Sequence, residues 1–308
     1  MLVNAETSFV ATSPTKARGE VPKMTVELTP ITDQDVAVVA DFLHANLNTR
    51  VPASVWARAM SVPWKVEAPN HGFMLTGEQH VVGAHLAFYS ERVVAGHVER
   101  FCNLGAWCVL PDFRFHSVRL LKALLAQDGY HCTDLSPSGN VVPLNARLEF
   151  RSLDTTTALV PSLPWPTLAR RTRISADPDV IESTLAGAEL ELYRDHAQAA
   201  AAHHLVLIRG GDSCYVMFRK VRRKELPVFA AILHVSDPEL FRRAILPLTR
   251  YLLVHYRVLV ILAELRIVGN RPRPSLMLPS PRPKMYRSTS LEPMQIDDLY
   301  SELVCVPW

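Results

Sequence analysis

The stretch WCVLPDFRFHSVRLLKALL, residues 107–125, combines an apolar strand, a short loop and an amphipathic helix. Pro111 and Arg114 lie in the loop, and leucines recur at helical spacing after Ser117. A helix N-terminus that follows a strand and a loop presents free backbone N–H groups and the positive end of the helix dipole. The stretch therefore predicts an anion-binding site at residues 114–119.

Hydrophobic periodicity places this stretch within a regular order of elements. In the first half we expect helices at 36–47 and 53–60, strands at 72–76, 81–89 and 103–110, a helix at 117–128, a strand at 131–135, a helix at 141–148 and a strand at 150–153. In the second half we expect strands at 204–209, 213–219 and 227–235, a helix to 256 and a strand at 258–264. Hairpin, third strand, helix and strand occur twice, which predicts a repeated architecture without a repeat at the level of residues.

The two strand-to-helix junctions differ in charge. The first carries Arg114, whereas the second begins with a capping box from Ser236 to Glu239 that includes Asp237. Acidic side chains at a helix N-terminus disfavour a second anion there. We therefore expect an anion site in the first half only.

Composition limits the class of protein. The 308 residues suit two domains, 48% of them are hydrophobic, and the net charge of +3 is too balanced for nucleic acid as the main partner. The apolar stretch 245–265 contains Arg250, His255, Arg257 and Glu264, so we interpret it as a buried helix and a strand rather than a membrane span.

Cysteine usage and the terminus complete this outline. The 5 cysteines include no C-x-x-C pair and are odd in number, which favours reduced thiols and a cytoplasmic protein. Residues 1–24 lack the apolar core of a signal peptide, so we expect a disordered extension or a true start at Met24. We expect a first domain at 25–158, a Pro-rich linker at 159–170 and a second domain at 171–308.

The first half resembles the GNAT superfamily of acyl-CoA-dependent N-acyltransferases. In that superfamily a strand leads into Arg/Gln-x-x-Gly-x-Gly/Ala and a helix, and the loop amides hold the pyrophosphate of coenzyme A. Arg114 to Arg119 match this loop, and Asn145 to Phe150 lie where the superfamily has an aromatic-x-Lys/Arg-Leu-Gly-Phe segment. The resemblance implies a mixed α/β (α+β) fold with two GNAT-like domains, each a mostly antiparallel sheet flanked by helices. The second copy is degenerate and is expected to lack its own cofactor site.

The resemblance also implies a reaction. An amine or hydroxyl acceptor, small or carrier-bound, attacks acetyl-CoA or a longer acyl-CoA directly, and no metal is involved. The residues expected at the cofactor are Cys108, Val109, Leu110, Arg114, Phe115, His116, Ser117, Val118, Arg119 and Asn145. The Val109 backbone N–H is the expected donor to the oxyanion. Glu99 is our candidate base, chosen over Glu91 and His97, although polar residues at a sheet edge are the plainer interpretation of all three.

Three departures from the superfamily pattern leave an alternative open. Ser117 and Arg119 replace the motif glycines; Arg119 either obstructs the phosphate or adds a charge-assisted contact. Asn145 replaces the frequent general-acid tyrosine and supplies no phenolic proton. Glu149 replaces the glycine of the Gly-Phe pair. The alternative is a non-catalytic acyl-CoA sensor or interaction module on the same fold.

Other polar residues permit two interpretations each. His116 contacts phosphate or is simply solvated, and we favour solvation. Residues 136–140 hold the pantetheine arm through Ser136, Ser138 or Asn140, or form a plain turn. Residues 219–224 meet a phosphate, an acidic carrier or nucleic acid, or are a solvated connection, which we favour. An acidic group near the C-terminus consists of Asp297, Asp298, Tyr300 and Glu302. It lines an acceptor pocket or is the solvated face of a short helix, and we favour the second.

Overall fold

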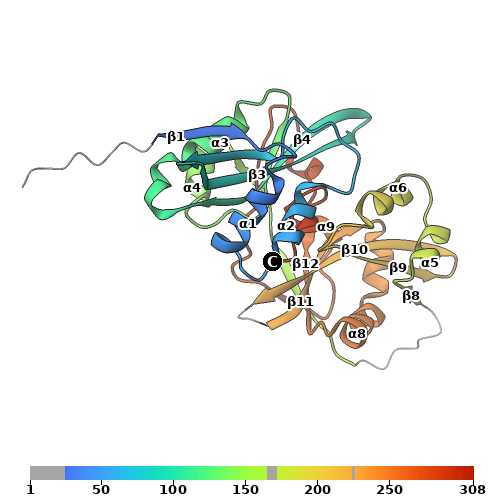
Figure 1. The fold of residues 1–308 in the computed structure, drawn as a ribbon. Helices are drawn as coiled ribbons and strands as arrows, with labels where there is room; N and C mark the ends of the chain where they lie inside the picture. The colour runs from blue at the N-terminus through green and yellow to red at the C-terminus, as the bar shows by residue number, and fades with distance from the viewer. Residues whose placement is uncertain (1–24, 165–171, 224–225) are drawn as a thin grey trace, which may run out of the picture.

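A computed structural model describes residues 25–164, 172–223 and 226–308, and over these ranges the chain forms two seven-stranded sheets flanked by helices (Figure 1). The first sheet has the order β1 (Val26–Pro30), β2 (Gly72–Gly77), β3 (His80–Val94), β4 (His97–Val109), β5 (His131–Asp134), β14 (Met285–Arg287) and β6 (Arg151–Ser152). The second has the order β13 (Leu276–Met277), β7 (Thr157–Pro161), β12 (Val260–Glu264), β11 (Leu226–Val235), β10 (Asp212–Arg223), β9 (His203–Arg209) and β8 (Arg173–Ser175).

The same strand arrangement occurs in both sheets. The orders β1-β2-β3-β4-β5 and β8-β9-β10-β11-β12 correspond position by position. Among the described residues, β4 with β5 and β11 with β12 are the parallel pairs, and the other pairs are antiparallel. The predicted repeated architecture and the predicted fold class, two mostly antiparallel sheets with flanking helices, are confirmed.

The two halves exchange strands. Strand β7 follows the first half in sequence but pairs with β12, and β14 comes from the second half but pairs with β5. Residues 159–161, expected to begin a Pro-rich connection, instead complete β7, because Leu159 and Val160 face Leu262 and Ile261 across the antiparallel ladder. The expected extension at 1–24 and residues 165–170 of the expected linker lie outside the described residues.

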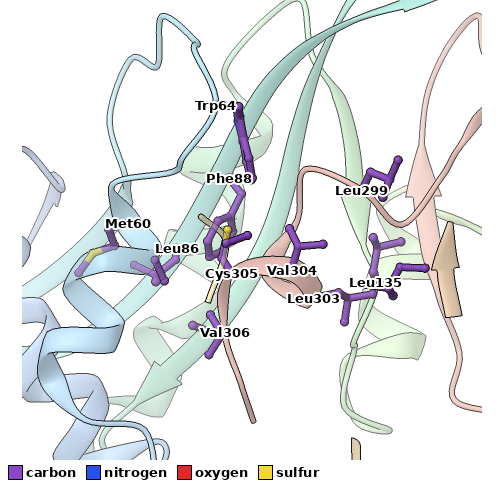
Figure 2. Packing of buried hydrophobic residues seen from close by; sticks show 14 of the residues in the cluster. Met60, Trp64, Leu86, Phe88, Leu135, Leu299, Leu303, Val304, Cys305 and Val306 are labelled. Atoms are coloured by element: carbon purple, nitrogen blue, oxygen red, sulfur yellow. The ribbon is translucent and has the colours of Figure 1, made fainter. Parts of the chain in front are cut away.

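Helices cover both faces of the first sheet because side chains alternate along a strand. Leu86 and Phe88 of β3 pack in one cluster with α1 (Val36–Asn46) and α2 (Ala53–Met60), and Ala87 and Tyr89 pack in another with α3 (Ser117–Leu125). Figure 2 shows Leu86 and Phe88 beside Met60, Cys305 and Val306. The C-terminal residues therefore share the core face of α1 and α2.

The remaining helices range from three residues in η3 to 12 residues in α8. They are η1 (Pro111–His116), α4 (Val142–Arg147), α5 (Pro178–Thr184), α6 (Gly187–His196), α7 (Pro238–Arg243), α8 (Ile245–Tyr256), α9 (Leu265–Val268), η3 (Pro293–Gln295) and α10 (Glu302–Cys305). Within the described ranges, no helix combines the length and the hydropathy needed to cross a membrane.

The predicted capping box of the second half is displaced by one residue. Asp237, not Ser236, caps α7, and its carboxylate accepts the N–H groups of Glu239 and Leu240 at 2.9 Å. The Ser236 hydroxyl accepts the N–H of Tyr215 instead. The expected single helix is divided at Ala244, between α7 and α8.

Candidate functional site

The parallel strands β4 and β5 separate part of the way along their length. Their pairing runs from Phe101 opposite His131 to Asn103 opposite Thr133, and no further pair joins them in the described ranges. Asn103 lies at this point: its amide donates to the Thr133 hydroxyl at 3.1 Å, and its carbonyl accepts the N–H of Glu302 at 3.0 Å. Beyond Asn103, the edge of β4 that faces β5 is therefore not paired with β5 in the described ranges.

A bulge bends β4 just beyond the separation. Ala84 of β3 lies opposite Cys108, but Leu86 lies opposite Gly105, so β4 carries one extra residue. Ala106, within the bulge, has a left-handed φ of 52°. Such bulges re-aim side chains and backbone groups and are common beside active sites.

The backbone N–H of Val109 is directed away from β3. Leu110 donates its N–H to Val82 O at 2.9 Å, so the neighbouring pair, Gly83 with Val109, is a non-hydrogen-bonded pair. In such a pair the N–H groups point outward from the two strands. The N–H of Val109 therefore faces the open side of β4.

A cavity of about 540 Å³ lies between the two sheets at this opening. Its wall includes, from the first sheet, Leu104, Gly105, Ala106, Trp107, Asp134, Leu135, Ser136 and Ser138. From the second sheet and the C-terminal segment it includes Arg219, Ala231, Ile232, Leu233, Leu262, Glu264, Asp298, Leu303 and Trp308. In Figure 1 the C-terminus likewise lies between the sheets. Both halves thus contribute to one cavity.

Two buried carboxyl groups lie at the β4–β5 opening. The Ser136 hydroxyl donates to Glu302 Oε1 at 2.7 Å, and the Asn145 amide donates to Asp134 Oδ2 at 2.8 Å. Burial raises the pKa of Glu302 to about 7 and that of Asp134 to about 6, against the opposing effect of these hydrogen bonds. Both groups therefore change protonation near neutral pH, as a general acid or base does.

A second buried cluster is closed on itself. Arg266 Nη2 lies 2.7 Å from Glu264 Oε1 and 2.7 Å from Asp298 Oδ1, and Lys284 contacts both carboxylates. Burial opposes ionisation of Asp298, but Lys284 and Arg266 hold its pKa below the ordinary value. Two cations and two anions balance here, so the cluster joins α9, β12 and the C-terminal segment without a net charge.

The predicted solvated face near the C-terminus is wrong. Asp298 and Glu302 have exposed fractions of 1% and 0%, and Tyr300 donates its hydroxyl to Asp195. The reason is visible in Figure 2, where Leu303, Val304 and the residues after them pack into the core of the first sheet. The helix α10 is therefore buried throughout and Glu302 points into the protein, whereas Asp297 keeps a half-exposed side chain that pairs with Arg92.

The prediction that residues 219–224 form a solvated connection is also wrong for the first of them, Arg219. Arg219 lies in β10 with an exposed fraction of 5%, and its Nη2 donates to Trp308 O at 3.2 Å. Burial lowers the pKa of its guanidinium to about 10. Arg222 and Arg282 also line the cavity, which gives this wall a basic character. Lys224 lies outside the described residues.

His85 is a cavity residue that the sequence pattern did not single out. Its ring stacks on Trp107 with centroids 4.7 Å apart, and burial lowers its pKa to about 3. The imidazole is therefore neutral at physiological pH. A histidine within an apolar strand carries no sequence signal of its own. Asp134 does carry one, because it ends a buried parallel strand whose carboxyl end opens onto the cavity.

The predicted phosphate loop has a closed backbone. Residues 111–116 form the 3₁₀ helix η1, whose internal hydrogen bonds run from an N–H to the carbonyl three residues earlier. Phe113 donates to Leu110 O at 3.0 Å, and Ser117 donates to Arg114 O. The expected free amides at 114–117 are therefore already used within the helix, and Asp112 adds a negative charge to its first turn.

The side chains of this loop have separate roles. Arg119 donates to Val26 O at 3.1 Å, so it holds β1 against α3. It also lies 3.3 Å from the His116 ring, whose pKa is lowered by burial and by this cation. Phe115 is 78% exposed. Arg119 is thus directed at the neighbouring strand.

The structure brings only part of the predicted site to the cavity. The Ser136 and Ser138 side chains belong to its wall; in the described chain the predicted residues at 108–110, 114–119 and Asn145 do not. The Glu99 carboxylate lies 2.9 Å from His131 Nε2. Glu99 precedes Phe101, where the pairing of β4 with β5 begins, so it lies at the end of β4 away from the opening. Glu91 lies 3.6 Å from Arg100. Our candidate base is therefore remote from the cavity.

Comparison with known proteins identifies the fold. No protein-family model and no curated protein match the sequence. A GCN5-related N-acetyltransferase from Anabaena variabilis is 11% identical with a TM-score of 0.55, over 85% of this chain and 72% of that chain. A probable N-acyltransferase from Enterococcus faecalis is 14% identical, with a TM-score of 0.53 over 87% and 74%. A putative acetyltransferase from Pyrococcus horikoshii is 10% identical, with a TM-score of 0.53 over 89% and 92%.

Proposed function

We propose that this chain, which has the fold of the GCN5-related N-acetyltransferases, transfers an acetyl or longer acyl group from acyl-CoA to an amine or hydroxyl acceptor. The observation that supports this most is the cavity at the separation of β4 and β5, where two carboxyl groups with raised pKa values meet the C-terminal segment. A concave site with a few convergent titratable groups is the usual setting for catalysis.

The proposed reaction is a direct attack in a ternary complex. Positioning the acceptor against the thioester supplies most of the catalysis. The N–H of Val109, two residues beyond Trp107 of the cavity wall and on the open side of β4, is the proposed oxyanion donor. A covalent intermediate on Cys108, the cysteine nearest to the bulge, is not expected, because burial raises the pKa of its thiol.

The loop at 114–119 is a poorer site for the pyrophosphate of coenzyme A than the cavity is for the thioester. The N–H groups of η1 already have acceptors, so phosphate would be held by side chains such as Arg114, or after η1 opens. This closed turn and the commitment of Asn145 to Asp134 favour a second candidate function. It is a non-catalytic binding or interaction module on the same fold.

Calorimetric titration with CoA, acetyl-CoA and longer acyl-CoAs tests the proposal. Arg114→Glu should weaken acyl-CoA binding about 10- to 100-fold, because a charge-assisted phosphate contact is replaced by repulsion. Its circular dichroism should be unchanged. Arg173→Glu on the edge strand β8 makes the same change of charge in the other sheet and should leave affinity unaltered.

Three outcomes of these binding and turnover measurements bear on the proposal. Failure of every acyl-CoA to bind would reject the proposal. Binding without thioester turnover across a wide panel of amines would reject the enzyme and support the non-catalytic module. An unchanged affinity in Arg114→Glu would remove Arg114 from the site while leaving the proposal in place.

A further inference from the structure

We propose that Ser136 and Glu302 form a proton-transfer pair, in which the Ser136 hydroxyl takes the proton of the acceptor amine and passes its own to Glu302. This inference rests on the proposed function and names the groups that move its proton. The hydroxyl belongs to the cavity wall and donates to Glu302 Oε1 at 2.7 Å. Ser136 is thus the proposed catalytic residue, and Glu302 acts through it.

The proton balance of the step is complete. The amine nitrogen forms a bond to the carbonyl carbon of the thioester, and the C–S bond breaks with its electron pair on sulfur. The surplus proton on nitrogen moves to Ser136 Oγ while the hydroxyl proton moves to Glu302. The same path then returns one proton to the thiolate, so the products are an amide and a free thiol, and both side chains regain their starting state.

Neighbouring groups hold Glu302 in this place. Its N–H donates to the Asn103 side chain at 3.0 Å, at the point where β4 and β5 separate. Gly105 leaves room for it: a Cβ at position 105 would lie 3.0 Å from Glu302 Cβ and 3.1 Å from a Phe88 ring carbon. A side chain at 105 would therefore press on the Glu302 side chain, and glycine leaves the space that Glu302 occupies.

The carboxyl group of Glu302 is unusual for a structural one. Its exposed fraction is 0%, yet Oε2 has no hydrogen-bond partner, and no cation lies within ion-pair distance of it in the described part of the chain. Buried carboxylates are normally paired, as Glu264 and Asp298 are here. An incompletely paired carboxyl group beside a cavity can change protonation without the loss of an ion pair.

The charged and titratable groups around Glu302 act in opposite directions. Asp134 of β5 raises the pKa of Glu302 and Arg219 of β10 lowers it. Burial and the nearby Glu302 carboxylate raise the pKa of Cys305, which lies on the same helix. Burial is the largest effect and sets the pKa of Glu302 near 7. A base with this pKa accepts and returns a proton at neutral pH.

The pH profile of turnover tests the pair. The wild-type kcat/KM, measured as thiol release from acetyl-CoA with an amine that turns over, should fall below about pH 7. Glu302→Gln should lower kcat by about 100-fold or more and abolish that limb. Ser136→Ala should behave alike, and Ser136→Thr, which keeps a hydroxyl, should restore activity. Glu99→Gln is the matched control and should keep the wild-type profile.

An infrared titration gives a reading that needs no activity. The wild-type minus Glu302→Gln difference spectrum should contain a carboxylic-acid C=O band that disappears around pH 7. Absence of this titration, an unchanged acid limb in Glu302→Gln, or loss of the limb in Glu99→Gln would each overturn the pair. Titration of the band without turnover of any thioester would instead overturn the proposed function.

Discussion

At the scale of single residues, burial of polar groups sets the chemistry of the cavity. Glu302 and Asp134 have raised pKa values and His85 a lowered one, and in all three burial is the largest cause. Each group is thereby biased toward its neutral form. Asp134 and His85 line the cavity and Glu302 lies behind Ser136, so these three groups add little charge to a wall that already holds Arg219, Glu264 and Asp298.

Glu302 should impose a pH dependence on stability. The pKa of its carboxyl rises from 4.5 in the unfolded chain to about 7 in the fold, so the folded state binds more protons between these values. This contribution to stability is complete below pH 4.5 and is lost as pH rises through 7, and the total loss amounts to about 3 kcal/mol. Urea unfolding at pH 5 and pH 8 should show Glu302→Gln gaining stability relative to the wild type at pH 8. If the free energies of unfolding of Glu302→Gln and the wild type differed by the same amount at both pH values, the raised pKa of Glu302 would be contradicted.

Gly105 should tolerate no side chain. Gly105→Ala places a methyl group 3.0 Å from Glu302 Cβ, and we expect a loss of about 1–3 kcal/mol in the free energy of unfolding from overpacking. Gly139→Ala is the control, because nothing lies within 4 Å of a Cβ there. Equal unfolding midpoints in urea for the two variants would show that α10 moves freely.

At the scale of elements, the C-terminal segment and η1 decide what reaches the site. Residues 296–308 close one side of the β4–β5 opening through Asp298, Leu303 and Glu302. The 3₁₀ turn η1 closes the predicted phosphate loop. The C-terminal segment places Glu302 beside the cavity, and the hydrogen bonds within η1 limit how coenzyme A can be held.

The cluster of Glu264, Arg266, Lys284 and Asp298 should anchor this segment. Lys284→Met leaves two carboxylates with one cation, and we expect a loss of about 3–5 kcal/mol in the free energy of unfolding. Adding Glu264→Gln restores the balance of charge and should recover part of the loss. Arg242→Ala, in the exposed pair with Glu239, should leave the free energy of unfolding almost unchanged in the same urea assay. A small effect of Lys284→Met alone would contradict the anchoring role.

The sequence was most informative where elements are long and regular. Strands β2 to β5, α3 and β9 to β12 were predicted because alternation and helical spacing persist over enough residues. The strand expected at 150–153 is present as β6, but β13 and β14, of two and three residues, are too short to carry a period. Strand β7 contains Leu159 to Pro161, where prolines favour a connection over a strand.

The candidate site was predictable only in part, for a similar reason. Ser136 follows a predicted strand, so its place at the opening could be anticipated, although its bond to Glu302 joins residues 166 positions apart. Charged residues in a short segment predict exposure, and tertiary packing overrides this for Asp298 and Glu302. Loop amides are predicted to be free by analogy, but local 3₁₀ bonding, which composition does not signal, uses them here.

At the scale of the whole molecule, the exchange of β7 and β14 joins the halves into one structure. Each sheet is completed by a strand from the other half of the chain, and the cavity is walled by both. The predicted boundaries at 158 and 171 remain a proposal for how the chain divides in sequence. We propose that the halves act on one shared acceptor site.

This exchange predicts cooperative unfolding. The whole chain should unfold in one transition by both circular dichroism and tryptophan fluorescence, because neither sheet keeps its strand order without the other half. A fragment of residues 25–158 lacks β14 and should show poor dispersion of its amide NMR signals. Two separate transitions, or a well-dispersed spectrum of the fragment, would contradict the prediction.

Amine-dependent release of free thiol from acyl-CoA tests the central claim most directly. Acetyl-CoA and longer acyl-CoAs are incubated with the full chain and a wide panel of amines at pH 8, with Glu302→Gln and Glu99→Gln in parallel. Thiol release should depend on an amine, fall about 100-fold or more in Glu302→Gln and persist in Glu99→Gln. Thiol release no faster than without protein, for every acyl-CoA and amine, would contradict the claim.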